Sequence, residues 1–414
     1  MADAQVIVVG GGPAGSSTAY FLARQGIDVL LLDRALFPRD KVCSEYMSPQ
    51  ASRILSAMDA LSAVEDSGAA QLAGMRVHAP NGLIIHGEFS ADHGFRGFRD
   101  RGLAVRRTVL DSILLERARE AGVRIEEGTR VTDVVKGAKG RVTGVVTGGG
   151  TKRETQRSAA AVIGADGLRS VIGRRLNLIR ASAWPRRIAL VTHYDGVEGM
   201  RGFGEMHVDR GGYCGLAEVG GGLTNVAVVV PVSRAAEVAA GRTEFLESWI
   251  TERPRIAAMF NHATRVDPVR ATGPFASSAR KAWTSGAALV GDAADFFDPF
   301  TGEGIYAALR GGEIAAPFIA ESVIARARGR NPDRPLGAYE AARRSEFSGK
   351  WKVERLVGAA VAVPAILNRA ATVLSRRRDM ADIFVGVVGD FVPPREIFRP
   401  SYLLQMMFSL PSHA

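Results

Sequence analysis

The chain has 414 residues, of which 46% are hydrophobic, and it carries a formal net charge of +10. This length suffices for two or more lobes with sizeable cores. The basic charge is spread along the chain and accompanies no base-stacking module or basic recognition helix, so we expect no nucleic-acid partner.

The first predicted element is an apolar strand that leads into the glycine-rich turn Gly10-x-Gly12-x-x-Gly15. Glycine at these positions permits a tight turn, close approach to a pyrophosphate and close packing of strand against helix. A helix predicted over residues 13–25 points its free N–H groups at the phosphates. A second strand, over residues 28–32, ends at Asp33, whose carboxylate is placed to bind ribose hydroxyls.

A loop is predicted over residues 37–49, because two prolines and mixed polarity break every periodic pattern there. A helix over 50–58 follows, and residues 75–86 are typical of a β-hairpin that turns at Pro80-Asn81-Gly82. Helical spacing returns over 107–118, a strand is predicted at 123–126, and a glycine-punctuated β meander over 131–162. The cofactor domain is therefore interrupted by β insertions.

Two further motifs follow the meander: GADGLRS over residues 164–170, and GDAA over 291–294 with DPFTGEG at 298–304 behind it. Together with the first glycine turn, they fit the three places where a chain would touch one long, folded dinucleotide. We expect this dinucleotide to be FAD. Asp166-Gly167 alone would also suit a β-turn, and Asp292 would also suit a helix N-cap.

Residues 187–230 alternate in the manner of an antiparallel sheet, and the chain beyond Gly304 is predicted to be helical to its end. Residues 402–408 would form a mostly apolar helix. Such a helix either packs against the other lobes or forms a lid or a surface that touches a membrane.

Several classes of site and location are disfavoured by the sequence. Two cysteines, Cys43 and Cys214, make no disulfide framework and suit a reducing cytoplasm. The predicted strand at the start leaves no room for a signal peptide, and no apolar stretch reaches about 20 residues. No metal-ligand cluster is visible among the seven histidines. We expect a cytoplasmic protein without a metal, soluble or peripheral at a membrane.

The order of GGGPAG, Arg107-x-x-x-Asp111, GADGxRS and GDAA resembles the flavoprotein superfamily with the p-hydroxybenzoate hydroxylase fold. Within it, Phe-Pro-x-x-Lys-x-Cys at 37–43 and Pro-Phe-Thr-Gly-Glu-Gly-Ile at 299–305 resemble the geranylgeranyl reductase-like branch. The resemblance covers residues 4–320. It implies an α/β fold, with a Rossmann-like FAD-binding domain, an interleaved antiparallel β-sheet substrate domain and a helical C-terminal region.

The resemblance also implies domain boundaries and cofactor contacts. The FAD-binding domain would comprise 1–70, 98–180 and 272–340, the substrate domain 71–97 and 181–271, and the helical region 341–414. The glycine turn would hold the pyrophosphate, Asp292 the ribityl chain, and the loop from Pro299 the isoalloxazine. The cofactor-binding residues expected in this way are Gly10, Gly12, Pro13, Ala14, Gly15, Asp33, Arg34, Cys43, Arg107, Val131, Asp166, Gly167, Gly291, Asp292, Pro299, Thr301, Gly302, Glu303, Gly304 and Ile305.

The substrate side of the flavin is expected to be lined by Tyr213, Cys214, Gly215 and Phe300. Prenyl reductases carry a Tyr-x-Trp-x-Phe-Pro-like strand at this place, whereas this chain has glycine and alanine where the two large aromatics stand. The change predicts room for a wider, ring-containing molecule. The Trp-x-Trp-x-Ile-Pro segment of flavin-dependent halogenases is also missing from the sequence.

These features predict an FAD-dependent oxidoreductase that takes electrons from NADH or NADPH. The leading reaction is that of a monooxygenase, a hydroxylase or epoxidase, acting on a small hydrophobic or aromatic metabolite. Reduction of carbon–carbon double bonds in an isoprenoid or quinone is the alternative, and a flavin-carrying electron-transfer or binding protein is a third. The sequence assigns no catalytic acid or base, because the flavin itself performs the difficult chemistry.

Overall fold

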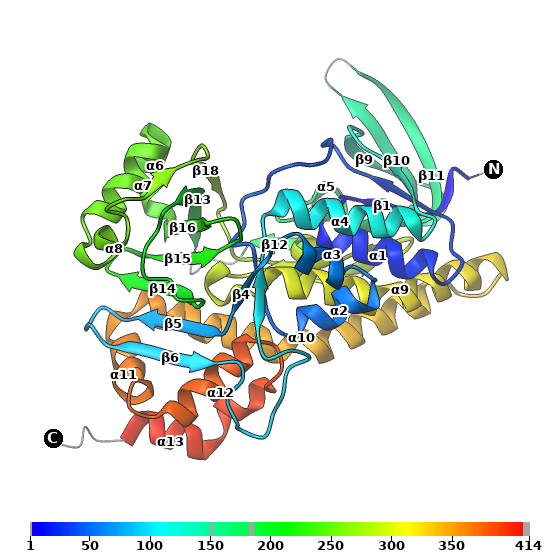
Figure 1. Ribbon diagram of the computed structural model, residues 1–414. Helices are drawn as coiled ribbons and strands as arrows, with labels where there is room; N and C mark the ends of the chain where they lie inside the picture. Colours follow the sequence, from blue (N-terminus) through cyan, green and yellow to red (C-terminus); the bar gives the residue numbers. More distant parts are fainter. Residues whose placement is uncertain (1, 150–151, 182–185, 409–414) are drawn as a thin grey trace.

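The computed structural model describes residues 2–149, 152–181 and 186–408. Two large sheets lie at opposite ends of the molecule, and long C-terminal helices connect them (Figure 1). The mixed helix and sheet architecture confirms the predicted α/β class.

The first sheet contains the predicted βαβ unit. β1 (Ala4–Val9) is almost entirely buried and pairs in parallel with β2 (Val29–Leu32) and with β11 (Lys152–Gly164). Its strand order is β20-β21-β11-β1-β2-β8, with β9 and β10 attached through β11. The other bounds are β8 (Arg124–Glu126), β9 (Val131–Lys136), β10 (Val142–Gly149), β20 (Trp283–Thr284) and β21 (Ala287–Leu289).

Three of these parallel strands end at one edge of the sheet. Val9 at the end of β1 pairs with Gly164 of β11, and Gly164 pairs with Leu289 of β21. The Ala165 amide donates to the Val9 carbonyl at 2.8 Å, and the Val290 amide to the Gly164 carbonyl at 3.0 Å. The three sequence motifs therefore begin side by side, and their predicted convergence is confirmed.

Helices cover the first sheet and bring the Pro299 loop to this edge. α1 (Pro13–Ala23) packs along α9 (Gly304–Ala327), where a side chain at Gly312 would stand 2.7 Å from Ser17. The Ser17 hydroxyl donates to the Leu309 carbonyl at 2.7 Å. The neighbouring helices are α2 (Ala51–Ala57), α3 (Leu61–Asp66), α4 (Arg107–Glu120) and α5 (Val171–Arg175).

The second sheet has the order β17-β13-β16-β15-β14-β5-β6, with β18 paired to β13. All its pairs are antiparallel except β14 with β5, and β5 with β6 forms the predicted hairpin. The bounds are β5 (Gly74–His78), β6 (Ile84–Glu88), β13 (Arg187–Asp195), β14 (Gly204–Asp209), β15 (Gly212–Glu218), β16 (Leu223–Pro231), β17 (Thr264–Arg265) and β18 (Arg270–Thr272).

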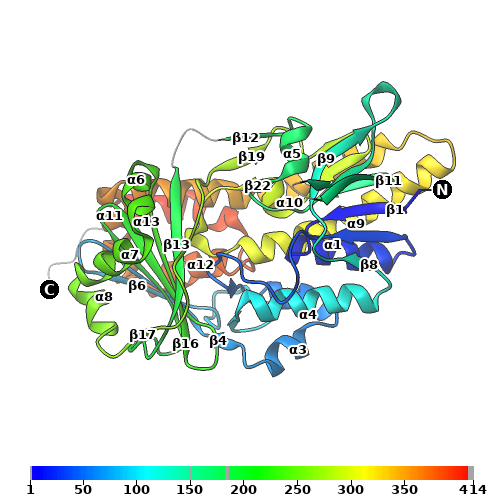
Figure 2. The ribbon, with the colours of Figure 1, turned by 90° about the horizontal axis from the view of Figure 1, so that it is seen from above.

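The two faces of the second sheet belong to different cores. One face packs against α6 (Ala235–Ala240), α7 (Arg242–Thr251) and α8 (Pro254–Met259), and the other faces the C-terminal helices (Figure 2). Because successive side chains of a strand point to opposite faces, neighbours in sequence enter different cores. Two small sheets complete the strands: β3 (Tyr46–Met47), β7 (Gly102–Ala104) and β4 (Ala70–Leu72), and β12 (Ile179–Ala181), β19 (Ser277–Ala279) and β22 (Asp295–Phe296).

The C-terminal region is helical as predicted: α10 (Asp333–Ala362), α11 (Pro364–Leu374), α12 (Arg378–Val388) and α13 (Pro400–Phe408). α10 runs without a break through the predicted domain boundary at 340–341, and it reaches both sheets. No single helix of the described chain is long and apolar enough to cross a membrane, although α10 and α11 together, bent by 108°, meet the length and composition for it.

Candidate cofactor and substrate site

The glycine turn has the geometry that its spacing predicts. Gly10 has φ +106°, and a side chain there would meet the Ala165 carbonyl oxygen at 2.5 Å. At Gly15 a Cβ atom would lie 1.7 Å from the Gly10 carbonyl oxygen, so α1 packs against the turn only because this side chain is missing. The space beside Gly12 is open as far as two guanidinium groups, at 3.4 and 3.6 Å.

These guanidinium groups belong to Arg39 and Arg107. Arg107 is buried and makes two hydrogen bonds of 2.8 Å to Asp111, and Arg39 lies 3.0 Å from the same carboxylate. Burial alone would lower the pKa of Arg107, but Asp111 outweighs it and the pKa is raised. Two positive charges shared by one carboxylate leave an anion site at the start of α1, which suits a pyrophosphate.

Asp33 stabilises the turn from the neighbouring strand. Its carboxylate accepts hydrogen bonds from the Gly11 amide at 2.7 Å and from the Ala35 amide at 2.8 Å. Asp166 plays a similar part in the second motif, where Oδ2 accepts from the Val171 amide at 2.6 Å while Oδ1 is buried without a partner. Burial raises the pKa of Asp166. Ribose binding by Asp33 stays a prediction.

One large cavity lies between the two sheets, and it brings most of the predicted site together. The predicted residues that line it are Gly12, Pro13, Ala14, Cys43, Arg107, Gly167, Tyr213, Gly215, Gly291, Asp292, Pro299, Thr301, Gly302, Glu303, Gly304 and Ile305. Gly10, Gly15, Asp33 and Asp166 lie behind this wall, Arg34 is exposed, and Val131 is the buried first residue of β9.

The prediction that Cys214 lines this cavity is wrong. Tyr213 and Gly215 of β15 face the cavity, so the residue between them points to the opposite side of the sheet. There Cys214 is fully buried in the core under α7, and burial raises the pKa of its thiol to about 12.

Phe300 is also displaced from its predicted role. Its ring packs edge-on against Tyr213 at 5.0 Å between centroids, and it lines a small neighbouring cavity instead of the large one. The reason is Asp298, which caps the turn that begins at Pro299 by accepting from the Phe300 amide at 3.0 Å.

The loop from Asp298 to Gly304 is anchored from three elements. Asp298 accepts from the Tyr213 hydroxyl at 2.7 Å and forms a buried ion pair with Arg187 of β13, which also donates to the Gly358 carbonyl of α10 at 2.9 Å. Gly302 has φ +70°, and a side chain there would stand 2.7 Å from the Tyr46 ring. The loop is therefore held rigidly at the cavity wall.

A second anchor lies at the Cys43 segment. Glu45 accepts from the Arg107 amide at 2.7 Å and lies 2.7 Å from His193, while Asn225 donates to the Cys43 carbonyl at 2.9 Å. Burial lowers the pKa of His193, but Glu45 and then Asp267 outweigh it and raise the pKa overall. No sequence motif contains Glu45 or Asn225, so only the fold reveals this network.

An acidic group closes the cavity on the side of α10. Glu303 is buried and lies 2.9 Å from Lys350, and Glu354, one turn further along α10, lines the cavity with Trp351 and Phe347. Burial is the main reason why the pKa of Glu354 is raised well above 4.5, and the neighbouring Glu303 raises it further. The pKa of Glu303 is raised as well, although Lys350 opposes the effect of burial.

Known protein families and individual proteins were compared with this chain, and the matches include the motifs described above. The model of the family described as FAD binding domain matches residues 3–348. The chain belongs to this family of FAD-binding flavoproteins. Digeranylgeranylglycerophospholipid reductase of Methanosarcina acetivorans is 30% identical over 331 residues, which are 77% of this chain and 75% of that protein. Menaquinone reductase of Mycolicibacterium smegmatis is 28% identical over 416 residues, 94% and 92% of the two chains.

Among solved structures, a mutant of a flavin-dependent brominase has a TM-score of 0.80 at 20% identity, covering 96% of this chain and 98% of that one. This similarity shows the shared fold only. The predicted membership in the p-hydroxybenzoate hydroxylase-fold flavoproteins, with likeness to geranylgeranyl reductases, is confirmed. The protein is an FAD-dependent oxidoreductase.

The residues present fit this cofactor. The closely packed glycine turn and the two arginines suit its pyrophosphate, and the start of α9 with the Gly302 and Gly304 backbone suits the flavin ring. Thr301 also offers a buried hydroxyl without a hydrogen-bond partner at this wall. Asp292 stands in a single 3-10 turn, where its side chain caps nothing and faces the cavity.

Replacing Asp292 with alanine is expected to weaken FAD binding by about tenfold to a hundredfold, since each lost charge-assisted hydrogen bond contributes about 1.5–3 kcal/mol. Its nearest cationic partner is Lys41, at 4.0 Å, so the ion pair itself contributes little. Fluorescence titration of the apoprotein with FAD measures the change. The exposed Asp66, replaced in the same way, serves as the control, and equal affinities of the two variants would remove Asp292 from the site.

Proposed function

We propose that this flavoprotein is a reductase that adds two hydrogens to a double bond of a hydrophobic substrate, an isoprenoid or a quinone. The observation that carries the proposal is Glu354, a carboxyl group that lines the cavity near Glu303 and Lys350 and has a raised pKa. The apolar side chains that line the same cavity include Ala189, Val191, Ala227, Val229, Phe275, Phe296, Phe297, Phe347 and Trp351. The names of the two reductases among its relatives support the same reaction.

Reduction of a double bond needs a hydride on one atom and a proton on the other. FAD, once reduced, supplies the hydride and its two electrons. Burial, and then the negative charges of Glu303 and Asp298, disfavour the ionised form of Glu354 and raise its pKa, so this carboxyl group keeps its proton to a higher pH than an ordinary glutamate. We assign to it the transfer of that proton to the second atom of the double bond, after which solvent returns a proton to the carboxylate.

The neighbouring residues position this acid and exclude water. Lys350 pairs with Glu303 at 2.9 Å and also with Asp390, so its charge is already engaged beside Glu354. Phe347 and Trp351 lie on the same helix and line the same cavity, where their apolar rings would help to exclude water from a bound substrate. Met206 and Gly215 would border the substrate from the opposite side.

Oxygen insertion is the second candidate, because Gly215 presents no side chain to the cavity. Part of the space predicted there is filled, since the Met206 sulfur lies 3.2 Å from the point where a Gly215 Cβ would stand. The space beside Gly215 was the reason to expect a wide substrate and hence a monooxygenase, and the Met206 side chain makes that space smaller. We therefore rank the reductase first.

The deciding experiment follows the product mass under air and under nitrogen. The purified protein with FAD is incubated with NADH or NADPH and with menaquinone or a geranylgeranyl lipid. A gain of two hydrogens without dependence on oxygen supports the reductase. A gain of one oxygen atom, seen only in air, contradicts it and favours the monooxygenase. Flavin reduction without any product contradicts both and favours an electron-transfer or binding protein. The same incubations identify the nicotinamide donor, which stays a prediction.

Replacing Gly215 with tryptophan is expected to abolish turnover of a substrate that contains a ring while FAD remains bound. The indole would extend into the cavity, because even a Cβ atom there already contacts the Met206 sulfur. Steady-state rates and the flavin spectrum of the holoprotein provide the measurement. Gly215→Ala is the matched control and should keep its activity, since the flexible Met206 side chain can move by a few tenths of an ångström. Turnover by the tryptophan variant would show that this strand does not border the substrate.

The helix α13 is the place where we propose a peripheral membrane contact. Leu403, Leu404 and Met407 are 39%, 51% and 58% exposed, and Arg399 lies just before them with an exposed side chain. Exposed apolar residues beside basic ones suit an anionic lipid surface. Replacing both Leu404 and Met407 with glutamate should release the protein from anionic vesicles in a flotation assay, whereas the exposed Gln405→Glu should not. Equal flotation of both variants would contradict the contact.

A further inference from the structure

Two histidines and a glutamate meet on the face of the second sheet that points away from the large cavity. His78 is the last residue of β5, and Glu205 and His207 belong to β14, which pairs with β5 in parallel. His207 lies directly opposite His78, and Glu205 shares the face of His207 because the two residues are separated by one position. The expectation of no metal-ligand cluster is therefore wrong, since residues about 130 positions apart come together across two strands.

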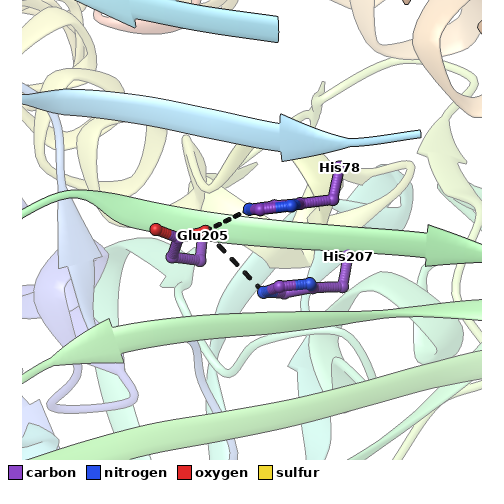
Figure 3. Close-up of side chains that lie close together, drawn as sticks. All are labelled: His78, Glu205 and His207. Carbon is purple, nitrogen blue, oxygen red and sulfur yellow. Dashed lines mark hydrogen bonds and ion pairs between the residues drawn. The ribbon is translucent and has the colours of Figure 1, made fainter. Parts of the chain in front are cut away.

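The two imidazole rings lie one above the other, and each is joined to the Glu205 carboxylate by a hydrogen bond or ion pair (Figure 3). Nε2 of His78 lies 2.5 Å from Oε2 of Glu205, and Nε2 of His207 lies 3.7 Å from the same oxygen. The two imidazole rings are stacked, with centroids 4.1 Å apart and planes within 11° of each other. All three potential ligand atoms lie within 4.8 Å of one another.

One of these groups has an unmet need for a partner. His207 is only 5% exposed, and its buried Nε2 atom has no hydrogen-bond partner. Burial is the main reason why the pKa of His207 is lowered to about 3, with smaller contributions from His78 and Arg255. A buried ring nitrogen without a partner is the kind of group that binds a metal ion.

We propose that His78, Glu205 and His207 bind one divalent transition-metal ion, with Zn²⁺ as the representative ion. Two imidazole nitrogens and one carboxylate oxygen form a ligand set that zinc uses with three protein ligands and one open position. Ligands about 2.1 Å from a tetrahedral zinc ion lie about 3.4 Å from each other, so the ligand atoms need to move by less than about 1.5 Å. At least one of the stacked imidazole rings must also turn, because a metal ion lies near the plane of each ring that binds it. This inference does not depend on the proposed reaction, because the site lies on the other face of the sheet.

The surroundings set the orientation of the carboxylate and limit the affinity. Arg76, opposite Glu205, donates to Oε1 at 3.2 Å and so leaves Oε2 for the ion. The positive charges of Arg76 and Arg255 oppose a cation, so we expect a dissociation constant in the micromolar range instead of the far tighter binding of closed structural zinc sites.

The experiment uses the full-length protein with FAD bound, freed of metal by dialysis against a chelator. Titration with Co²⁺ is followed at wavelengths longer than those absorbed by flavin, where tetrahedral cobalt absorbs. We expect saturable binding of one ion that Zn²⁺ displaces. His78→Gln and His207→Gln should each weaken binding at least tenfold. His86→Gln is the matched control, because His86 contacts Arg76 from β6 but lies outside the cluster.

A second measurement, of thermal stability with and without Zn²⁺, tests the site even if a variant is less stable than the unaltered protein. Saturating Zn²⁺ should raise the Tm of the unaltered holoprotein and of His86→Gln, but not that of His78→Gln, whose side chain is the most exposed of the three. The retained flavin spectrum shows that each variant is folded. The proposal is overturned if the unaltered protein shows no saturable cobalt absorption, or if His78→Gln binds Co²⁺ and gains stability from Zn²⁺ as the control does.

Discussion

Replacing Glu354 with glutamine is expected to lower kcat for double-bond reduction by about a hundredfold or more, because a general acid typically contributes a factor of 10² to 10⁴. The amide has nearly the same shape but no proton to give. FAD affinity should be unchanged, since the residues that we expect to contact the pyrophosphate and the ribityl chain, Gly12, Arg107 and Asp292, belong to other segments of the cavity wall. The measurement compares steady-state turnover with single-turnover reoxidation of the reduced enzyme by substrate.

The pH dependence distinguishes proton donation from a structural role. The pKa of Glu354 is raised, so the carboxyl group keeps its proton to a higher pH than an ordinary glutamate and loses it as the pH rises through that raised pKa. Turnover of the unaltered enzyme should therefore fall on the alkaline side, while the residual rate of Glu354→Gln should not show this step. Glu321→Gln, at an exposed site on α9, is the control. An unchanged kcat in Glu354→Gln would remove this residue from the reaction.

Replacing Gly15 with alanine is expected to abolish FAD binding. A Cβ atom at this position would lie 1.7 Å from the Gly10 carbonyl oxygen, and that contact is with backbone that cannot move without opening the turn. The start of α1 would then shift away from the pyrophosphate position. Purification should give a colourless protein that is not restored by added FAD.

The matched control for Gly15→Ala is Gly337→Ala. Gly337 lies within α10, where a Cβ atom would make an ordinary contact of 3.5 Å with Trp283, and alanine favours the helix by roughly 0.5–1 kcal/mol. This variant should keep its flavin and unfold at an equal or higher temperature. If Gly15→Ala keeps FAD with unchanged affinity, the turn does not approach the cofactor.

The parts of the site that the sequence predicts are those in which backbone geometry demands a residue type. Gly10 with its positive φ and Gly15 with its missing side chain are needed wherever this turn occurs, so their spacing alone reveals them. The parallel strands are recognisable for a similar reason, because burial on both faces requires nearly continuous apolar runs such as β1.

The residues that the sequence did not reveal act through contacts between distant segments. Arg187 and Asp298 are 111 positions apart, and Glu45 and His193 are 148 apart, so no local pattern announces either pair. Glu354 stands on a long amphipathic helix whose charged residues would ordinarily face water. Only the position of α10 against the cavity distinguishes it from Glu321 or other exposed acids.

The misplacement of Cys214 has the same origin in strand geometry. The sequence placed residues 213–215 near the flavin as one block, whereas the pleat divides them between two cores. In β14 the same alternation sends Met206 into the cavity and sends Glu205 and His207 to the opposite face.

β14 thus places Met206 on the cavity face of the sheet and the proposed metal ligands on the other face, and this arrangement limits how the chain can change in length before the strand. Deleting or inserting one residue in the turn before Gly204 would invert every side chain of the strand. His207 would then face the cavity, and Met206 would take its place beside His78. A single substitution on one face of β14 leaves the side chains of the other face in place. We therefore expect related chains to differ in the residues of β14 more often than in the length of the turn that precedes it.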